Sequence, residues 1–502
     1  MFKRSIQIVI LLVVIVGMLY YTNTHFSSVI TASVSIITSL TVLFVGLVIF
    51  MENRNPSSTM AWILILALVP VVGFIFYLLF GQSYRKRRKF DRKALQDAQM
   101  YLSFKNQDQR SDYSNFPVNQ QKMFHLANNI AKSHLSLSTH TKVLTNGGMT
   151  FAAIVEELNK ATHHIHIEYY IYRDDEIGKQ IQNILLQKAK EGVKVRFLFD
   201  AVGSYKLPES FIEEMRAGGI EAIAFDPVTF PLFSSKVNYR NHRKIIVIDG
   251  QVGFIGGLNV GDEYLSRSTT YGFWRDTHLL VTGEAVRTLQ FIFMTDWYHM
   301  TGKTYSNQAY VPPVLTDGKE DGAVQIIASG PDQQITAMKN LFFSMITSAE
   351  KSIWVATPYF IPDDDIFTAL RVAAMSGIDV KILFPKKPDK WLPYLASHSY
   401  FPGLVDSGVN IYEYERGFMH SKILIVDGVM ASIGTANMDM RSFHLNFEVN
   451  AFLYDTESTE QLVADYEADL ADSVRLDSDR IKNRGYVVRF LESAARLMSP
   501  LL

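Results

Sequence analysis

Three apolar stretches open the chain, at residues 6–21, 29–50 and 60–80. The second and third are about 20 residues long, which is the length that an α-helix needs to cross a bilayer. The first is shorter and follows Lys3 and Arg4, so it is either a span or a signal-like segment; retention is favoured because no clear small-x-small cleavage site follows it. The pattern predicts two or three transmembrane helices within residues 1–82, and it is compatible with either number.

A run of basic residues comes directly after the third stretch. It extends from Arg85 to Lys89 and is followed by Arg92 and Lys93. Such a run is often only a solvated helix face, but directly after a span it indicates a cytoplasmic stop and contact with anionic lipid. Residues 83–135 are therefore interpreted as a basic collar and a polar linker with a short helix.

The hydrophobic pattern then becomes a repeat of strands and helices. Residues 161–200 and residues 349–385 each run from an apolar strand through an acidic loop to a helix ending at glycine, Gly192 or Gly377, and on to a second strand. Alternation of this kind predicts βαβ units. We expect an α/β fold with two similar halves, 136–315 and 316–502, each with a mixed, largely parallel sheet flanked by helices.

A hairpin pattern stands near the middle of the first half, within 238–265. The apolar run after Lys244 predicts a buried strand that ends in an Asp-Gly turn at Asp249, followed by a strand from Val252 to Ile255. Alternate side chains of a strand share a face, so His242 and Lys244 point the same way. Asp249 has the opposite parity.

The same pattern returns within 415–442, in the second half. His420, Lys422 and Asp427 repeat the spacing of the first copy, and Gly434 and Asn437 follow at the offsets of Gly256 and Asn259. One such match is weak, whereas two with the same downstream offsets are hard to explain by chance. Duplication is the simplest account, and it predicts that each half brings one His-Lys pair to a shared cleft.

The paired H-x-K-x4-D-x6-G-x-x-N pattern resembles the phospholipase D superfamily. Residues outside the motifs make the chain similar to the bacterial cardiolipin synthase branch: ENRNPSSTMAW (52–62), IASGP (327–331), TPYFIPDDD (357–365), NMDMRSFHLNFE (437–448) and the terminal SPLL. The resemblance implies a phosphatidyltransferase that joins two phosphatidylglycerol molecules into cardiolipin and releases glycerol. It also implies a phosphohistidine intermediate and no metal or other cofactor.

Exchange of a phosphodiester needs a nucleophile, a proton donor for the leaving oxygen and positive charge at the phosphoryl oxygens. By resemblance, His242 is the nucleophile and His420 the acid and base, although the sequence itself is symmetric about this choice. Lys244 and Lys422 suit phosphate as point charges.

Four further acidic and two amide side chains complete the predicted site. The amides of Asn259 and Asn437 can donate to phosphate oxygens. The resemblance implies that Asp276 and Glu448, downstream of the two motifs, orient the histidines. Asp249 and Asp427 belong to the catalytic motif of the family, but their parity and Asp-Gly context favour turn or network roles.

The composition limits the classes of partner and of functional site that the chain can have. The formal net charge is −1, which argues against nucleic acid, and the absence of cysteine excludes disulfides, thiolate metal sites and a cysteine nucleophile. The expected partners are phosphatidylglycerol and an anionic bilayer, at a bacterial cell membrane that the chain crosses more than once, with the catalytic body on the cytoplasmic side. The alternatives are a hydrolytic phospholipase, a nuclease of the same superfamily and a non-catalytic membrane scaffold.

Several other residues have two interpretations. A strand edge is favoured over a metal site for the three histidines His163, His164 and His166, and a structural role for His278 and His444. The strand-end aromatic residues line the cleft mouth or belong to the core: Tyr169, Tyr170, Tyr359 and Phe360. Trp391 contacts lipid or lies in a surface turn. Residues 480–502 form an amphipathic helix at a membrane surface or an ordinary packed helix, with equal support.

Overall fold

The computed structural model describes residues 113–227, 238–303, 308–313, 321–333 and 335–501, together with helix α3 (Pro56–Leu68) and isolated earlier positions that include Lys93. The chain divides into two compact units, one of residues 1–89 and 228–238, the other of residues 90–227 and 239–502. The predicted spans lie largely outside the described residues. Within the described part of the chain, no helix combines the length and the apolar character needed to cross a bilayer.

The first half of the larger unit is built on a seven-stranded sheet. Its neighbouring strands are, in order, β1 (Thr139–Thr145), β8 (Thr277–Gly283), β6 (Val252–Gly256), β5 (Ile245–Ile248), β2 (His164–Tyr169), β3 (Lys194–Asp200) and β4 (Glu221–Phe225). Its helices are α7 (Asn146–Lys160), α8 (Glu176–Lys190), α9 (Glu209–Ala217) and α10 (Ala285–Thr301).

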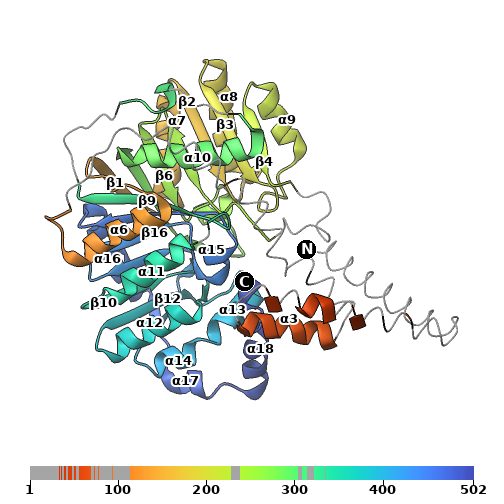
Figure 1. The fold of residues 1–502 in the computed structure, drawn as a ribbon. Helices are drawn as coiled ribbons and strands as arrows, with labels where there is room; N and C mark the ends of the chain where they lie inside the picture. Colours follow the sequence, from red (N-terminus) through yellow and green to blue (C-terminus); the bar gives the residue numbers. More distant parts are fainter. Residues whose placement is uncertain are drawn as a thin grey trace. The chain divides into compact units, whose positions relative to one another are not determined.

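The second half repeats this order. Its sheet runs β9 (Ala323–Ser329), β18 (Glu448–Tyr454), β16 (Met430–Gly434), β15 (Ile423–Val426), β10 (Ser352–Ala356), β12 (Asp379–Pro385), β13 (Asn410–Tyr414) and β19 (Ser473–Arg475). Its main helices are α11 (Ala337–Thr347), α12 (Asp364–Met375), α13 (Trp391–His398), α14 (Phe401–Val405), α16 (Glu457–Ala471) and α18 (Tyr486–Arg496). Figure 1 shows the two halves of this unit.

The repeat predicted from the sequence is confirmed strand for strand, since β2–α8–β3 and β10–α12–β12 occupy equivalent places. The acidic loops begin the two helices. Asp175 accepts a hydrogen bond from the Gly178 N–H at 3.2 Å, and Asp363 accepts one from the Ile366 N–H at 3.1 Å, so each carboxylate caps its helix.

The prediction of a largely parallel sheet is wrong, while that of a mixed sheet is confirmed. Within the two large sheets of the described chain, β2–β3, β3–β4, β10–β12 and β12–β13 are parallel and the other neighbours are antiparallel. The βαβ units supply only these strands. The hairpins around the Asp-Gly turns, and the strands that extend them, add the antiparallel part because short turns can join only antiparallel neighbours.

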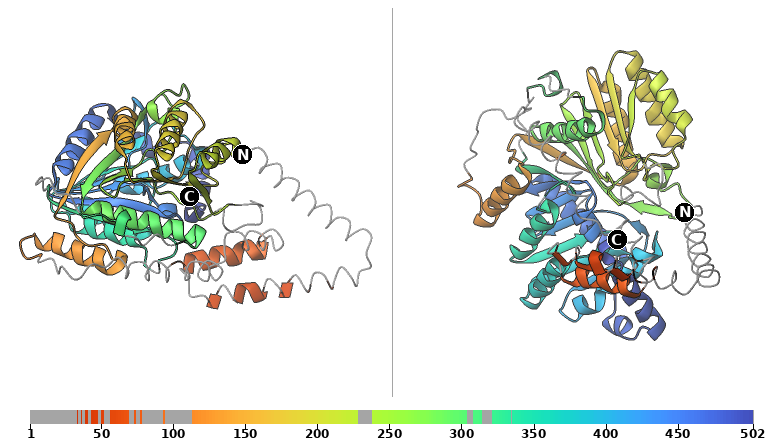
Figure 2. Two further views of the ribbon diagram at one scale, coloured as in Figure 1. Left: turned by 90° about the horizontal axis from the view of Figure 1, so that it is seen from above. Right: turned by 45° about the vertical axis from the view of Figure 1, so that its right-hand side comes forward.

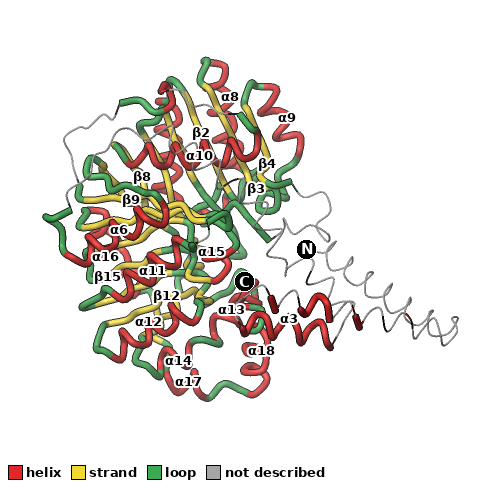
Figure 3. The backbone as a smooth tube through the Cα atoms, viewed as in Figure 1, coloured by secondary structure: helices red, strands yellow, loops and turns green. Residues whose placement is uncertain are grey.

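The two sheets face one another across a shared apolar core. Side chains from both halves meet there, among them Val247, Ile255, Val281, Ile326, Ile425 and Ala451. Other helices cover the outer faces, with α7, α8 and α9 on the first sheet and α11 and α12 on the second. Figure 3 shows the strands between these helices, and the right-hand view of Figure 2 shows α8 and α9, in yellow, far from the blue second half.

Helix α6 (Val118–Ala131) is the short helix expected in the linker. Its buried residues Met123, Phe124 and Ala127 belong to the apolar core of the second half. Phe124 lies edge-on to Tyr454, with ring centroids 4.8 Å apart. This part of the predicted linker is therefore packed against the second half.

Candidate active site

The backbone that carries His242 pairs with the other half of the molecule. The His242 N–H donates to the Phe447 carbonyl at 2.9 Å, and the Phe447 N–H donates to the Arg240 carbonyl at 2.9 Å. This short parallel bridge fixes the chain just before β5 against the chain just before β18. Glu448 is the next residue after Phe447, so the bridge brings its carboxylate to His242.

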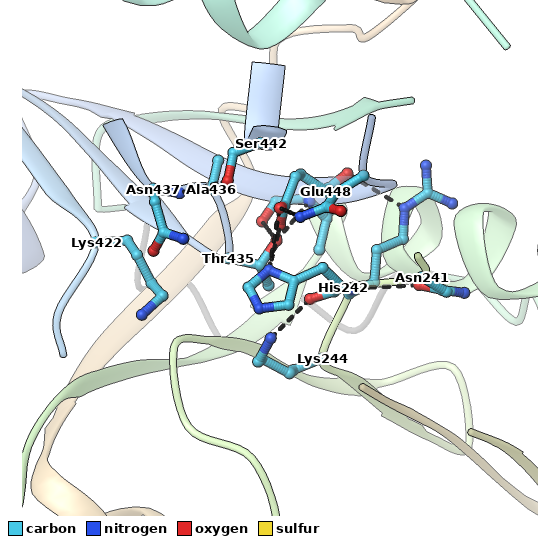
Figure 4. Close-up of polar contacts among 12 residues, drawn as sticks. Asn241, His242, Lys244, Lys422, Thr435, Ala436, Asn437, Ser442 and Glu448 are labelled. Atoms are coloured by element: carbon cyan, nitrogen blue, oxygen red, sulfur yellow. Dashed lines mark hydrogen bonds and ion pairs between the residues drawn. The ribbon is translucent and has the colours of Figure 1, made fainter. Parts of the chain in front are cut away.

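Glu448 and His242 form a hydrogen-bonded pair across the two halves. The two carboxylate oxygens of Glu448 lie 2.9 and 3.0 Å from Nδ1 of His242. The carboxylate is fully buried, and it also accepts hydrogen bonds from Thr435 Oγ1 at 2.5 Å and from Asn446 Nδ2 at 3.1 Å. Figure 4 shows the imidazole below this carboxylate. With Nδ1 protonated and directed at Glu448, Nε2 carries the lone pair.

An equivalent backbone bridge positions His420, with the roles of the two halves exchanged. Strand β14 (Gly417–Met419), from the second half, pairs in parallel with β7 (Phe273–Arg275), from the first half, and the His420 N–H donates to the Arg275 carbonyl at 2.7 Å. The following residue, Asp276, accepts from His420 Nδ1 at 2.6 Å. Each histidine is thus oriented by a carboxylate that belongs to the other half.

The two sequence-predicted acids therefore do contact the histidines, but crosswise. Asp276 follows the first motif and contacts His420 of the second, while Glu448 follows the second motif and contacts His242 of the first. Among the described residues, neither His242 nor His420 is paired with a carboxylate of its own half. A functional site with oriented histidines requires both halves to be folded together.

Burial lowers the pKa of both histidines. The pKa of His242 is lowered to about 4, first by burial and then by the charges of Lys244 and Lys422, although Glu448 acts to raise it. The pKa of His420 is also lowered to about 4 by burial and by Lys422, against the opposing effect of Asp276. Without an anion in the site, both imidazoles are neutral near pH 7, as a nucleophile requires.

The lysines of both motifs lie beside these rings. Lys244 Nζ donates to the His242 carbonyl at 2.7 Å, and Lys422 Nζ donates to the His420 carbonyl at 2.5 Å. Burial lowers the pKa of Lys244 to about 7 and that of Lys422 to about 8, and the charge of Lys422 also acts to lower the pKa of Lys244. Two ammonium groups at one site favour a bound anion, because its charge offsets their repulsion.

The two motif asparagines occupy different settings. Asn259 is buried; its Oδ1 accepts from the Ile171 N–H at 3.1 Å, and its Nδ2 donates to the Tyr264 hydroxyl at 3.1 Å. Asn437 is 5% exposed and hydrogen-bonds with its side chain to Asp439, which lowers the pKa of that otherwise raised carboxyl. Figure 4 shows Asn437 near Lys422. Donation from either asparagine to a phosphate oxygen stays a prediction.

Asp249 and Asp427 lie away from His242 and His420, at the far ends of β5 and β15. Asp249 accepts from the backbone N–H groups of Thr162, His163 and His164, each at 2.8 Å. Burial acts to raise the pKa of Asp249, yet these hydrogen bonds hold it below its ordinary value. Five residue steps along an extended chain separate Asp249 from Lys244, roughly 15 Å.

Asp427 makes the matching contacts in the second half. It accepts from the N–H groups of Glu350, Lys351 and Ser352 at 2.9, 2.7 and 2.8 Å. Both aspartates also have the positive φ that their turns require, 54° for Asp249 and 56° for Asp427. Their carboxylates therefore tie the hairpins to the chain entering β2 and β10, in agreement with a network role and not with direct contact to substrate.

Replacing Asp427 by alanine is expected to lower the stability of the fold more than the rate of turnover. The change removes three hydrogen bonds to a charged acceptor and places alanine at a positive φ, so the free energy of unfolding should fall by about 2–4 kcal/mol. Thermal unfolding of the purified enzyme measures this as a lower midpoint. Enzyme that remains folded at low temperature should retain its turnover; loss of turnover at an unchanged midpoint would instead assign Asp427 to the chemistry.

Aromatic rings surround the two histidines. Tyr170 lies edge-on to His242, with centroids 4.8 Å apart, and its ring lies 5.5 Å from Lys244 Nζ. Trp274 lies 4.9 Å from the His420 ring. Tyr170 was among the strand-end aromatics expected at the cleft mouth or in the core, whereas Tyr169 and Phe360 are buried core residues. Trp274 and Thr435 were not predicted as site residues, although Thr435 lies within the second motif and Trp274 lies two positions before Asp276.

Two predictions outside the motifs are wrong. His164 and His166 do not lie at a strand edge; both are buried in β2, between β3 and β5. Gln290 Nε2 donates to His166 Nδ1 at 2.7 Å, which explains how these polar rings are accommodated. Lys93, expected to contact lipid, is 1% exposed and forms ion pairs with Asp296 at 3.3 Å and Asp332 at 3.1 Å. The preceding basic run, Arg85 to Lys89 and Arg92, lies outside the described residues.

Comparison with known families gives two matches. Residues 154–297 and 342–470, one stretch in each half, match the family described as "Cardiolipin synthase, PLD-like domain". Residues 36–82 match the family described as "Phospholipase_D-nuclease N-terminal". The first match covers more than half of the chain and includes both histidines.

Curated relatives match along the whole chain. A protein named cardiolipin synthase from Geobacillus sp. (strain WCH70) is 53% identical over 502 residues, with 100% of each chain covered. A protein of the same name from Halalkalibacterium halodurans (strain ATCC BAA-125 / DSM 18197 / FERM 7344 / JCM 9153 / C-125) is 54% identical over 502 residues, again with 100% of both covered.

Among solved structures, phosphatidylserine synthase from Haemophilus influenzae Rd KW20 has a similar fold. The TM-score is 0.57 at 14% sequence identity, and the match covers 77% of this chain and 100% of that one. At this identity the likeness concerns the fold alone.

Proposed function

The chain belongs to the phospholipase D-like cardiolipin synthase family, and on that premise we propose that it transfers a phosphatidyl group between two phosphatidylglycerol molecules, giving cardiolipin and glycerol. The observation that carries the proposal is the pair of histidines oriented by carboxylates from opposite halves, with two lysines beside them. This constellation can divide nucleophilic and acid-base roles around one phosphodiester.

In the first half-reaction, Nε2 of His242 attacks the phosphorus of one phosphatidylglycerol. The bond between phosphorus and the headgroup glycerol oxygen breaks, and protonated His420 gives its proton to that oxygen. Glycerol leaves, and the phosphatidyl group stays on His242 as a phosphohistidine. Lys244 and Lys422 offset the charge that develops on the phosphoryl oxygens.

His420 takes up its proton from water when the anionic substrate binds. In the absence of substrate, burial and Lys422 keep the pKa of His420 low, at about 4. A phosphodiester bound between the lysines adds a negative charge next to the ring, which raises the pKa of the imidazole. Asp276 stays ionised, since although burial acts to raise its pKa, His420 and Lys422 hold it below the ordinary value.

In the second half-reaction, neutral His420 removes the proton from a headgroup hydroxyl of a second phosphatidylglycerol. That oxygen attacks phosphorus, the bond to His242 breaks, and cardiolipin leaves. Water in the place of the second lipid would give phosphatidic acid through the same residues. Acceptor choice therefore depends on the local concentration of lipid hydroxyl at the site.

We further propose that residues 1–82 anchor the enzyme in the bacterial cell membrane through two or three spans at 6–21, 29–50 and 60–80, with the catalytic body on the cytoplasmic side. The match of residues 36–82 to an N-terminal family module supports a distinct segment there. The proposed division then continues with a collar and linker at 83–135 and halves at 136–315 and 316–502. An anchored site meets its lipid acceptor at a high local concentration.

Product analysis tests the function. Membranes that carry the enzyme are incubated with phosphatidylglycerol labelled in its headgroup glycerol, and the lipids and the water-soluble products are separated. One free glycerol per cardiolipin is the expected result. Phosphatidic acid and free glycerol without cardiolipin would establish hydrolysis. If the unaltered protein releases no labelled glycerol, a non-catalytic membrane scaffold is the alternative that remains.

Anion binding should depend on pH through the two lysines. Only the ammonium form attracts an anion, and the pKa values of Lys244 and Lys422 without anion are about 7 and about 8. The affinity for sulfate, whose charge is constant over this range, should fall as the pH rises through both pKa values. Calorimetry on the purified enzyme measures it.

Lys244→Arg is the matched variant for this titration. A guanidinium stays protonated throughout the range, so the decrease in affinity should begin near pH 8 instead of near pH 7. An affinity for sulfate that is unaffected by pH between 6 and 9, tested over that range, would contradict the assignment of the lysines as the anion-binding charges.

A further inference from the structure

Helix α18, near the end of the chain, carries its large apolar side chains on the outside. Tyr486 is 89% exposed, Phe490 72% and Leu497, just after the helix, 83%. Val487, on the same side, is 73% exposed. At 3.6 residues per turn these positions share one face of the helix.

The inner face of the same helix is partly polar. Its buried residues are Glu492 and Ala495, 4% and 3% exposed. Arg484 Nη1 donates to Glu492 Oε1 at 2.6 Å and to the carbonyl of His398 at 3.1 Å. A helix that only covers a soluble core turns its apolar stripe inward. In α18 the buried carboxylate of Glu492 is paired with Arg484, and the aromatic side chains face outward. The outer face is therefore suited to contact with another apolar environment.

Helix α13 lies against α18 and also has exposed apolar side chains. The two helices are in direct contact, and the His398 carbonyl at the end of α13 accepts from Arg484. Trp391 and Leu392, at the start of α13, are 72% and 42% exposed. We call these side chains the apolar patch: Trp391, Leu392, Tyr486, Val487, Phe490 and Leu497. Figure 1 shows α13 and α18 beside one another.

The apolar patch borders the active site. Asp389, two residues before Trp391, accepts a hydrogen bond from the Tyr359 hydroxyl. Its charge acts to raise the pKa values of His420 and Lys422, which places it within electrostatic range of both catalytic groups. Lys390 Nζ lies 5.8 Å from the Tyr359 ring centroid. The loop that leads into α13 is thus part of the rim of the site.

Basic side chains accompany the patch. Lys386, Lys387 and Lys390 are exposed in the loop before α13, and Arg489 is exposed on α18. Lys386 pairs with Glu415, whereas the neighbouring acid on α18, Glu492, is buried. Exposed aromatic and aliphatic side chains with basic neighbours are the combination that binds an anionic lipid surface.

We propose that the apolar patch on α13 and α18 inserts into the surface of a bilayer containing anionic lipid and presents the active site to the headgroups. The proposal rests on the proposed function, because that function requires two lipid substrates to reach the histidines. It assigns to the catalytic body its own contact with the membrane, apart from residues 1–82. The apolar side chains enter the interface, and the lysines and Arg489 contact lipid phosphates.

A single label tests the contact. The chain has no cysteine, so Phe490→Cys introduces a unique thiol for an environment-sensitive fluorophore. Met375→Cys, at a 62% exposed apolar position on α12, is the matched control. The full-length protein is reconstituted in vesicles of phosphatidylglycerol and brominated phosphatidylcholine. Quenching by bromine is expected at position 490 and not at 375.

Kinetics supply the second measurement. Phe490→Glu should lower kcat/KM on phosphatidylglycerol vesicles by about tenfold, mainly through KM, and leave turnover of a soluble short-chain phosphatidylglycerol unchanged, because burying a charge in the interface is costly while the site is intact. Met375→Glu should change neither. Equal quenching at 490 and 375, or equal activity of the two glutamate variants on vesicles, would overturn the proposal.

Other occupants of the patch have distinct outcomes. A second copy would give a rapid disulfide dimer of Phe490→Cys in detergent, and a segment of the chain itself would shield the label equally with and without lipid; either result overturns the proposal. Quenching requires no turnover, so a failure of the proposed function leaves this test readable. An enzyme that hydrolyses phosphatidylglycerol would still show the contact.

Discussion

Replacing His242 by alanine should lower phosphatidyl transfer by roughly 10⁴- to 10⁶-fold, because it removes the atom that forms the bond to phosphorus. Replacing His420 by alanine should cost roughly 10²- to 10⁴-fold, the range for loss of a general acid or base. The two variants should differ in where the reaction stops. His242→Ala forms no covalent intermediate, whereas His420→Ala forms it slowly and releases it slowly.

The rate of cardiolipin formation in reconstituted membranes measures both effects. His125→Ala, at an exposed position on α6, is the matched histidine control and should stay within about threefold of the parent, as surface changes generally do. Full activity of folded His242→Ala would remove that residue from the chemistry. A dead His125→Ala would point to a general loss of folding.

Glu448→Gln should lower turnover by roughly 10²- to 10³-fold, although Glu448 belongs to the other half from the histidine it contacts. An amide can still accept the Nδ1 hydrogen bond, but it cannot stabilise an imidazolium or fix the tautomer as a carboxylate does. Since the charge of Glu448 acts to raise the pKa of His242, its loss should move that pKa further below about 4.

The crosswise arrangement can be tested separately from activity. Histidine resonances of the labelled enzyme, titrated with acid, should show the His242 pKa lowered in Glu448→Gln and the His420 pKa lowered in Asp276→Asn. The opposite pairing would put each acid with the histidine of its own motif and would contradict the contacts across the two halves. Equal shifts in the pKa values of both histidines in each variant would mean that the acids act only through long-range electrostatics and not through a specific contact.

Local features of the site were readable from the sequence. Apolar runs on each side of an Asp-Gly pair predict a hairpin, and β5–β6 and β15–β16 confirm it in both halves. The repeat likewise predicted the equivalent β2–α8–β3 and β10–α12–β12 units. These predictions succeed because the periodicity of side chains and the demands of tight turns act over a few residues.

The pairing of acids with histidines was not readable in the same way. Asp276 lies 34 positions after His242 and Glu448 lies 28 positions after His420, so sequence distance favours pairing each acid with the histidine of its own half, which is not the pairing that the structure has. The crossing arises from two backbone bridges between halves, Asn241 with Phe447 and β14 with β7. Contacts of this kind depend on how two folded sheets meet, which short-range pattern does not specify.

The errors have a similar origin. A run such as His164 to His166 is polar by composition, but Gln290 and Arg196 from other elements supply hydrogen bonds that let β2 be buried. Lys93 follows a basic run, yet Asp296 and Asp332, more than 200 positions later, draw it into the interior. In both cases a distant partner offsets the cost of burying a polar group.

The location of the phosphatidyl group after a brief reaction shows which histidine forms the bond to phosphorus. The enzyme is mixed with phosphatidylglycerol labelled in its phosphate, quenched within one turnover and digested, and the labelled peptide is identified. We expect an acid-labile, base-stable label on the peptide that contains His242, longer-lived in His420→Ala and absent from His242→Ala. Label on His420 in the parent enzyme, or cardiolipin formation without any labelled histidine, would contradict this expectation.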